Sequence, residues 1–231
     1  MMFPKVLVGS PINERKAYCM DDYLTNCYNL TYPNKKFYFV DNSENRDWHV
    51  DNIIAKGFDC DYVNPKGRTN QQYICISQNA IRQKAIVENF DFLMFIECDI
   101  FPKKNIIEEM VAYNEKVVAC NYFIRQRENS HLLKTEIEKT TFANYTNRNI
   151  NDAEGFLDYV GNKKRSSMFG FGCCLIRRDV FTKINFHVNN YDRSHADTPF
   201  HFDLWEEGIE PICHPEIVRH MNSSWKKVLD T

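Results

Sequence analysis

Phe92-Leu-Met-Phe-Ile-Glu97-Cys-Asp99-Ile-Phe-Pro102 is the most informative stretch of the chain, because an uninterrupted apolar run leads directly into two carboxylates. Five consecutive apolar residues are typical of a central parallel strand that is covered on both faces. Side chains two residues apart on a strand point to the same side, so Glu97 and Asp99 are expected to face one point at the strand's carboxyl end. Two hard oxygen ligands at such a point suit Mg2+ or Mn2+. Acidic residues before a proline can also do no more than end a strand or cap a helix.

The composition indicates an ordinary globular domain. With 231 residues, of which 43% are hydrophobic, the chain can bury one core, and we predict a single domain over residues 1–231. A net charge of −2 gives no overall attraction to nucleic acid or to an anionic membrane. The nine cysteines form no CxxC pair, and no apolar run is long enough for a signal peptide or a membrane span. We therefore expect a reducing, cytoplasmic location.

The first half of the chain alternates between two patterns. Short apolar runs at Lys5–Gly9, Phe37–Val40 and Phe58–Val63 predict strands, and helical spacing at Lys16–Leu30 and Asn70–Asn89 predicts helices. Residues Ser10 to Arg15 are expected to form a loop. Strands that alternate with helices predict an α/β fold of the Rossmann-like kind, with a mostly parallel central sheet flanked by helices.

The second half continues this pattern around a polar insertion. We expect a helix at Lys103–Asn114 and a strand at Lys116–Tyr122, followed by a further strand at Phe169–Arg178 and a helix that begins at Asp197. The intervening stretch, Arg125–Ser167, is polar and weakly periodic. It is predicted to be a long loop or flap, and structureless segments of this length are often functional lids.

Three polar clusters follow predicted strands. They are Ser10–Glu14, Asp41–Ser43, and Glu97 with Asp99. In an open parallel sheet, ligands bind beyond the carboxyl ends of the strands, near the point where the strand order reverses. Amides and carboxylates in the first two clusters suit a nucleobase and a ribose, and the third cluster suits a metal ion carrying a diphosphate.

In this order of motifs, the sequence resembles the metal-dependent nucleotide-sugar glycosyltransferases of the GT-A fold, particularly small family-2-like members. The resemblance extends from Lys5 to about Ser224. The matching pieces are Pro11, Asn13 and Glu14 after the first strand, Val40-Asp41-Asn42-Ser43, Ser77-Gln-Asn79-Ala-Ile-Arg82, Glu97-Cys-Asp99 in place of the family's Asp-x-Asp, Gly170-Phe-Gly172-Cys-Cys-Leu-Ile-Arg-Arg, and His220.

The resemblance implies a donor site in the first half of the chain. About residues 1–124 would bind a nucleotide-diphosphate sugar, most simply a UDP-sugar, and about residues 125–231 would form the acceptor side with its flap. The implied donor-binding residues are Pro11, Asn13, Glu14, Asp41, Asn42, Asn79, Arg82, Glu97 and Gly172.

The resemblance also implies a bound Mn2+ or Mg2+. Asp99 is the expected direct ligand, with Glu97 and His220 completing the site. Because the family's first Asp is Glu97 here, its longer side chain is expected to reach the metal or the ribose through water.

For the catalytic base, the family places an acid at the start of a late helix facing the acceptor. Asp203 is the first candidate, with Glu206 or Glu207 as alternatives, and Asp203 as base implies inversion at the anomeric carbon. The acceptor is open: a glycan, a lipid, a protein or a hydroxymethylated base in DNA would each offer a hydroxyl.

Two other functional hypotheses stay open. A nucleotidyltransferase on a related sheet usually has a glycine-rich, basic loop after the first strand, whereas Gly9–Glu14 offers one glycine and an acid. A non-catalytic module that binds a sugar nucleotide or a protein is permitted by Glu97 in place of the family's Asp.

Overall fold

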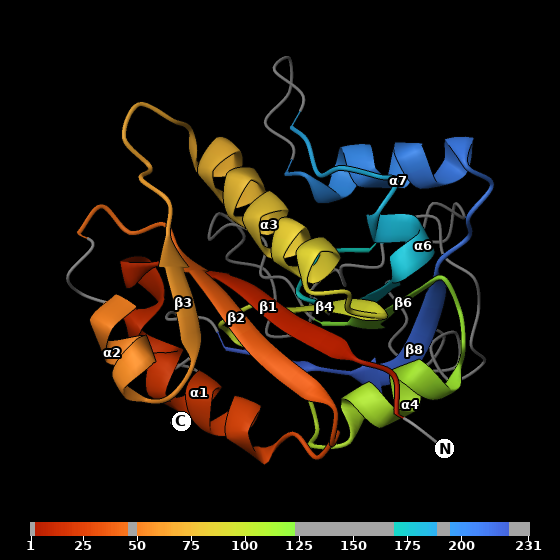
Figure 1. Cartoon of the computed structure of the whole chain (residues 1–231), viewed down its shortest axis with the longest axis horizontal. Helices are drawn as coiled ribbons and strands as arrows, with labels where there is room; N and C mark the ends of the chain where they lie inside the picture. Colours follow the sequence, from red (N-terminus) through yellow and green to blue (C-terminus); the bar gives the residue numbers. More distant parts are fainter. Residues whose placement is uncertain (1–2, 46–49, 123–168, 189–194, 222–231) are drawn as a thin grey trace, which may run out of the picture.

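The fold is built on a seven-stranded sheet with helices on both faces (Figure 1). A computed structural model describes residues 3–45, 50–122, 169–188 and 195–221. The elements are β1 Val6–Ile12, η1 Glu14–Cys19, α1 Met20–Asn29, β2 Lys35–Asp41, α2 Val50–Ala55, β3 Asp59–Tyr62, α3 Asn70–Val87, β4 Phe92–Ile96, β5 Ile100–Phe101, α4 Ile106–Ala112, β6 Val117–Asn121, β7 Cys173–Arg177, α6 Arg178–Phe181, α7 Asp197–Glu206, β8 Ile212–Ile217 and β9 Arg219–His220.

The strand order of the sheet is β3-β2-β1-β4-β7-β6-β8. The first four strands in this order run parallel to one another, and β7 is antiparallel to both of its neighbours. A separate two-stranded antiparallel sheet joins β5 to β9. The sequence prediction of an α/β fold with a mostly parallel central sheet is confirmed.

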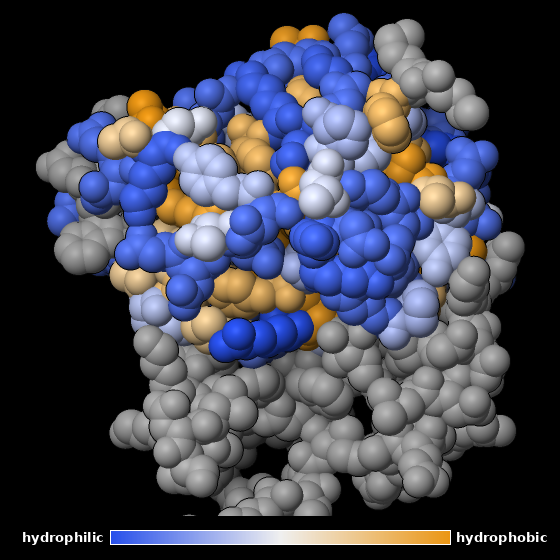
Figure 2. Space-filling view, turned by 90° about the horizontal axis from the view of Figure 1, so that it is seen from below, coloured by the Kyte–Doolittle hydropathy of each residue, from blue (hydrophilic) through white to orange (hydrophobic). Residues whose placement is uncertain are grey.

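Alternating burial along the strands divides the hydrophobic core into two parts. Val6 and Val8 of β1 pack with α1, α2 and α4 on one face, and Leu7 packs with α3, α6 and α7 on the other. The same two helix layers are visible below and above the sheet in Figure 1. Seen from the side of α1 and α4, the described surface is mostly hydrophilic with smaller apolar areas (Figure 2). Within the described ranges, no helix is long and apolar enough to cross a membrane.

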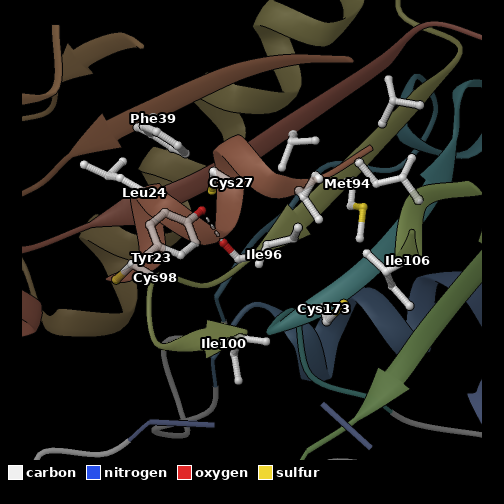
Figure 3. Close-up of a cluster of buried hydrophobic side chains, with 14 of the residues drawn as sticks. Tyr23, Leu24, Cys27, Phe39, Met94, Ile96, Cys98, Ile100, Ile106 and Cys173 are labelled. Atoms are coloured by element: carbon white, nitrogen blue, oxygen red, sulfur yellow. Dashed lines mark hydrogen bonds between the residues drawn. The ribbon is translucent and has the colours of Figure 1, made fainter. Parts of the chain in front are cut away.

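A buried hydrogen bond fastens α1 to the end of the central strand. The Tyr23 hydroxyl donates to the Ile96 carbonyl over 2.8 Å, within the cluster drawn in Figure 3. Both side chains are fully buried. Because an unpaired buried hydroxyl or carbonyl is unfavourable, this bond holds β4 in place immediately before Glu97.

The N-terminus of α3 is fixed by a capping box. The Thr69 hydroxyl accepts from the Gln72 backbone N–H over 3.3 Å, and the Gln72 side chain accepts from the Thr69 N–H over 2.9 Å. This reciprocal pair satisfies two backbone donors that would otherwise have no partner, and it defines where α3 begins.

Several element boundaries differ from the sequence prediction. The expected loop at 10–15 is wrong, because β1 continues along β2 as far as the pair Ile12↔Asp41 and η1 then begins at Glu14. The expected helix at 16–30 is divided into η1 and α1. The strand predicted to start at Phe169 starts at Cys173, and the short elements α2 and β5 were not predicted. The predicted flap at 125–167 lies outside the described residues.

Gly9 lets α3 approach β1 closely. A Cβ atom at position 9 would lie 2.2 Å from Cγ2 of Ile81, which is fully buried on α3. Non-bonded carbon atoms do not approach this closely, so α3 rests on the bare backbone of β1.

Gly9→Ala is therefore expected to lower the free energy of unfolding by about 1–3 kcal/mol, the usual range for overpacking a core. Urea denaturation of Gly9→Ala, Ile81→Ala and the double variant measures the effect. We expect the double variant to be less destabilised than the sum of the single variants, because removing Cγ2 relieves the clash. Additive losses would show that the two sites do not meet.

Candidate active site

A cleft of about 420 Å3 lies at the carboxyl ends of the parallel strands β1, β2 and β4. Residues of α3, the start of α7 and β9 complete its walls. Of the side chains predicted from the sequence to form the site, six line this cleft: Pro11, Asn13, Asn42, Glu97, Asp99 and His220. A larger, more open hollow of about 900 Å3 lies around Lys5, Asp91 and Arg178, and none of these six residues borders it.

Glu97 and Asp99 reach the cleft from a turn. β4 ends at Ile96, and the Ile100 N–H donates to the Glu97 carbonyl over 2.9 Å, which closes the turn. The prediction that both carboxylates share one face of a strand is therefore wrong in its backbone geometry. The chain must bend here to begin β5, and the turn presents both acidic side chains to the same cleft.

Asp99 is the centre of the charged groups in the cleft. Its Oδ2 atom lies 3.1 Å from His220 Nε2 and forms an ion pair with Lys16 Nζ. His220 is held there by the β5–β9 pairing, in which Ile100 is the partner of His220. The Met221 N–H also donates to the Asp99 carbonyl over 2.7 Å. Three segments far apart in the sequence thus meet at one carboxylate.

The charges of this cluster support one another. Burial alone would raise the pKa of Asp99, but the hydrogen bond from His220 and the charge of Lys16 hold that pKa below its ordinary value. The pKa of Lys16 is raised, since the effect of Asp99 outweighs the opposing effect of burial. Burial and the neighbouring charge of Asp99 raise the pKa of Glu97. Asp99 is therefore the carboxylate that stays ionised.

Amide side chains connect the ends of β1 and β2 to α3. Asn13 Nδ2 donates to the backbone oxygen of Asn42 over 3.0 Å and to its Oδ1 over 2.9 Å. Asn42 Nδ2 in turn donates to Ser77 Oγ over 3.2 Å. This chain of hydrogen bonds fixes the wall of the cleft beside Pro11.

Asp41 and Glu14 lie behind that wall. Asp41 is fully buried, and its Oδ1 accepts from the Ser43 N–H over 2.8 Å and from the Ser43 hydroxyl over 2.6 Å. The Glu14 N–H donates to Ser43 Oγ over 2.8 Å. Neither Asp41 nor Glu14 is among the residues that line the cleft.

Asn79 and Arg82 bind the end of α6 and the segment that follows it. Asn79 Nδ2 donates to the Phe186 carbonyl over 2.6 Å, and its Oδ1 accepts from the Phe186 N–H over 3.2 Å. Arg82 donates to the carbonyls of Phe181 and Thr182. Both side chains were predicted to contact the donor, and the structure places them outside the cleft lining.

Gly172 shapes the cleft through its neighbour Tyr122. The Gly172 N–H donates to the Tyr122 hydroxyl over 3.1 Å, and its carbonyl accepts from the Glu97 N–H over 2.8 Å. A Cβ at position 172 would lie 2.3 Å from the Tyr122 ring. Only glycine leaves room for the ring, which lines the cleft together with Phe171.

The carboxylates of α7 and of Glu207, directly after it, fall into two groups. Asp197, the first residue of the helix, lines the cleft, and burial raises its pKa. Asp203 lies 3.0 Å from His187 Nε2, and Glu206 and Glu207 are exposed. None of these last three carboxylates lines the cleft.

The cleft residues that the sequence analysis did not propose for the site include Lys16, Asn70, Tyr73, Gln78 and Asp197. The α3 residues carry a usable signal, since polar positions 70, 73 and 78 recur on one side of a helix that precedes the acidic strand. Lys16 carries no such signal, because its partner Asp99 is 83 positions away.

A second acidic cluster lies away from the cleft. Ligand-type atoms of Glu109, His214 and Glu216 lie within 4.8 Å of one another. Lys103 Nζ sits 2.7 Å from Glu109 Oε2 and 3.2 Å from Glu216 Oε2. The Lys103 ammonium group pairs with both carboxylates, so the geometry is that of an ion-pair network.

The arrangement of the described elements matches several solved structures, of which one contains a nucleotide sugar and another a nucleotide. The chain is similar to the mannosyltransferase PcManGT of Pyrobaculum calidifontis, solved with GDP-Man and Mn2+, with 14% identity and a TM-score of 0.62 over 94% of this chain and 56% of that one. It is also similar to TarS of S. aureus in complex with UDP (11% identity, TM-score 0.58, 98% of this chain and 62% of that one). A197 of STIV matches with 10% identity and a TM-score of 0.51 over 95% of this chain and 86% of that one.

No protein-family model matches the sequence, and no curated protein matches it. The chain spans 56% of the length of the mannosyltransferase and 62% of the TarS chain. The protein has the GT-A-like fold of nucleotide-sugar glycosyltransferases, as the sequence resemblance implied.

His201 holds the backbone beside Phe171 in place. It is 1% exposed on α7, and its Nε2 atom lies 2.8 Å from both the backbone nitrogen and the backbone oxygen of Phe169. Burial lowers the pKa of His201 from 6.5 to about 4. The folded protein therefore keeps this imidazole neutral.

Between pH 6.5 and pH 4 the unfolded chain binds a proton at His201 that the folded chain does not, so the free energy of unfolding falls as the pH falls. From pH 7 to pH 5 this loss is about 2 kcal/mol. His201→Gln keeps a nitrogen near the position of Nε2 and does not titrate. Urea denaturation at both pH values should show the wild type losing about 2 kcal/mol more than the variant, and equal losses would contradict the assignment.

Proposed function

We propose that this protein is a glycosyltransferase that moves a sugar from a nucleotide-diphosphate donor to an acceptor hydroxyl. The observation that carries the proposal is the convergence of Asp99, His220 and Glu97 in one cleft at the carboxyl ends of the parallel strands. Ligands of open α/β sheets bind at this edge. The GT-A-like fold supports the same assignment.

The cleft offers a ligand set that suits Mn2+ or Mg2+. A carboxylate held ionised at Asp99 and an imidazole 3.1 Å away at His220 provide oxygen and nitrogen donors, and Glu97 adds a second carboxylate from the same turn. When bound, such an ion would stabilise the negative charge that develops on the leaving diphosphate.

The chain's own residues would bind and orient the two substrates. Asn13 and Asn42 fix the wall where a nucleobase and ribose would lie, and Lys16 brings a positive charge to the diphosphate. A UDP-sugar is our first candidate for the donor. GDP-mannose is the second, because the similar mannosyltransferase was solved with it.

Asp197 is the base that we propose in place of Asp203. Asp197 lines the cleft, and its raised pKa makes its carboxylate a better proton acceptor for the attacking hydroxyl. Asp203 instead faces His187. A base on the acceptor side that assists direct displacement would invert the anomeric centre.

The proposal is tested by measuring the release of nucleoside diphosphate from UDP-sugars and GDP-mannose, with Mn2+ and with chelator. The natural acceptor is not needed, since water can serve as a poor acceptor. Asp99→Asn is expected to lower the metal-dependent rate by at least about 100-fold because it removes the charged ligand. Asp197→Asn should lower the rate by about 100-fold or more through loss of the base.

Asp203→Asn is the matched control, since it makes the same chemical change on the same helix outside the cleft lining. Its rate should stay within about threefold of the wild type. A chelator-resistant rate, or one that Asp99→Asn leaves unchanged, would contradict the metal site. A loss confined to Asp203→Asn would restore Asp203 as the base.

Lys16 competes with a metal ion for Asp99, because both cations are attracted to the same carboxylate. Lys16→Met should therefore strengthen Mn2+ binding in the absence of nucleotide, by about tenfold for each 1.4 kcal/mol of repulsion removed. Isothermal titration calorimetry measures this affinity. Arg15→Met is the control, since Arg15 also lines the cleft but pairs with Glu44. Weaker Mn2+ binding by Lys16→Met would contradict the competition.

A further inference from the structure

Gln78 is a buried amide that the proposed chemistry has not used. Its side chain lies on α3, is 4% exposed and borders the cleft. Its Oε1 atom is buried and, within the described part of the chain, has no hydrogen-bond partner. Leaving a buried amide oxygen unpaired is unfavourable in the free protein, and a ligand that supplies a donor would remove this penalty.

The other polar side chains of the same helical turn are already engaged. Ser77 accepts from Asn42 and donates to the Tyr73 carbonyl over 2.9 Å. Asn79 binds both backbone groups of Phe186. Gln78 lies between them and faces the cleft. Unlike its two neighbours, it has a side-chain oxygen that forms no structural hydrogen bond with the described residues.

Gln78 also occupies an inner position along the cleft wall. Asn70, Ile74 and Gln78 line the cleft at intervals of four residues, which places them on one side of α3. At 1.5 Å per residue, Gln78 lies about 12 Å along the axis from the start of the helix at Asn70. The capping box at Thr69 fixes that start, so the position of Gln78 is set before any ligand binds.

We propose that Gln78 is a specificity-determining residue that binds a hydroxyl group of the donor sugar nucleotide. The unpaired atom is an acceptor, so the ligand must bring a hydrogen-bond donor, which a hydroxyl has and an ionised phosphate lacks. The amide nitrogen of Gln78 can in turn donate to the same kind of group. This inference rests on the proposed function, because the hydroxyl belongs to the ribose or to the transferred sugar.

The test compares Gln78→Met with Gln83→Met. Methionine keeps the unbranched length of glutamine and lacks the amide. Gln83 is exposed on the same helix, so its variant makes the same change away from the cleft. In the ligand-free protein, Gln78→Met should raise the melting temperature by about 2–4 °C relative to Gln83→Met, because it removes an unpaired buried polar group.

The affinity measurements use UDP and UDP-GlcNAc, and GDP and GDP-mannose, each with Mn2+, for the wild type and both variants. For the sugar nucleotide that the wild type binds, Gln78→Met should lower the affinity by about tenfold, whereas Gln83→Met should leave that affinity unchanged. A loss for the sugar nucleotide, with no loss for the matching nucleoside diphosphate, assigns the transferred sugar. An equal loss for both ligands assigns the nucleoside part of the donor, which carries the ribose hydroxyls.

Unchanged affinity of Gln78→Met for these ligands, whatever its melting temperature, would overturn the role of Gln78 and leave the proposed function standing. Failure of the wild type to bind any of the four nucleotides would overturn both. The two failures are therefore distinguishable.

Discussion

A buried carboxylate at the end of the central strand organises this molecule. Asp99 is 2% exposed and stays ionised, which would be highly unfavourable without nearby positive charge. Lys16 provides that charge and His220 a hydrogen bond, from positions 83 and 121 residues away in the sequence. These two contacts to Asp99 thus fix η1 from the start of the chain and β9 from its later part against the end of β4.

The surrounding scaffold explains how this charge can be held in a fixed place. The Tyr23 hydroxyl secures the last carbonyl of β4, and the β5–β9 ladder positions His220. On the other face of the sheet, α3 packs closely on Gly9 and carries Gln78 into the cleft. The charged centre is therefore supported by apolar packing on both faces of the sheet, and the polar residues of the cleft are oriented before any ligand arrives.

Much of the fold could be predicted because its signals are local. The apolar run at 92–96 gave the central strand with its observed bounds, and the spacing at 70–89 gave α3 to within two residues at its end. The predicted ends of elements were wrong where strand pairing outweighed the local sequence pattern. The backbone of β1 continues beyond Gly9 and Pro11 because β2 offers partners as far as Asp41.

The site was predictable only in part, for a physical reason. Asp99, Glu97 and His220 could be proposed from residue types and motif order. Lys16 and Asp197 could not be separated from other surface charges, because what distinguishes them is proximity across the sequence. Asn79 and Arg82 lie on the predicted helix but point toward the segment after α6, which a motif alone does not reveal.

The most direct test is the thermal unfolding of the wild type and of Asp99→Ala with UDP, GDP and CDP, each in the presence of Mn2+ or of chelator. A diphosphate at 100 times its dissociation constant stabilises the protein that binds it by about 2.7 kcal/mol. We expect one nucleotide to raise the melting temperature of the wild type with Mn2+, and we expect that rise to disappear with chelator and in Asp99→Ala. Absence of a shift with all three nucleotides, or a shift that Asp99→Ala retains in full, would contradict a metal-assisted donor site at Asp99.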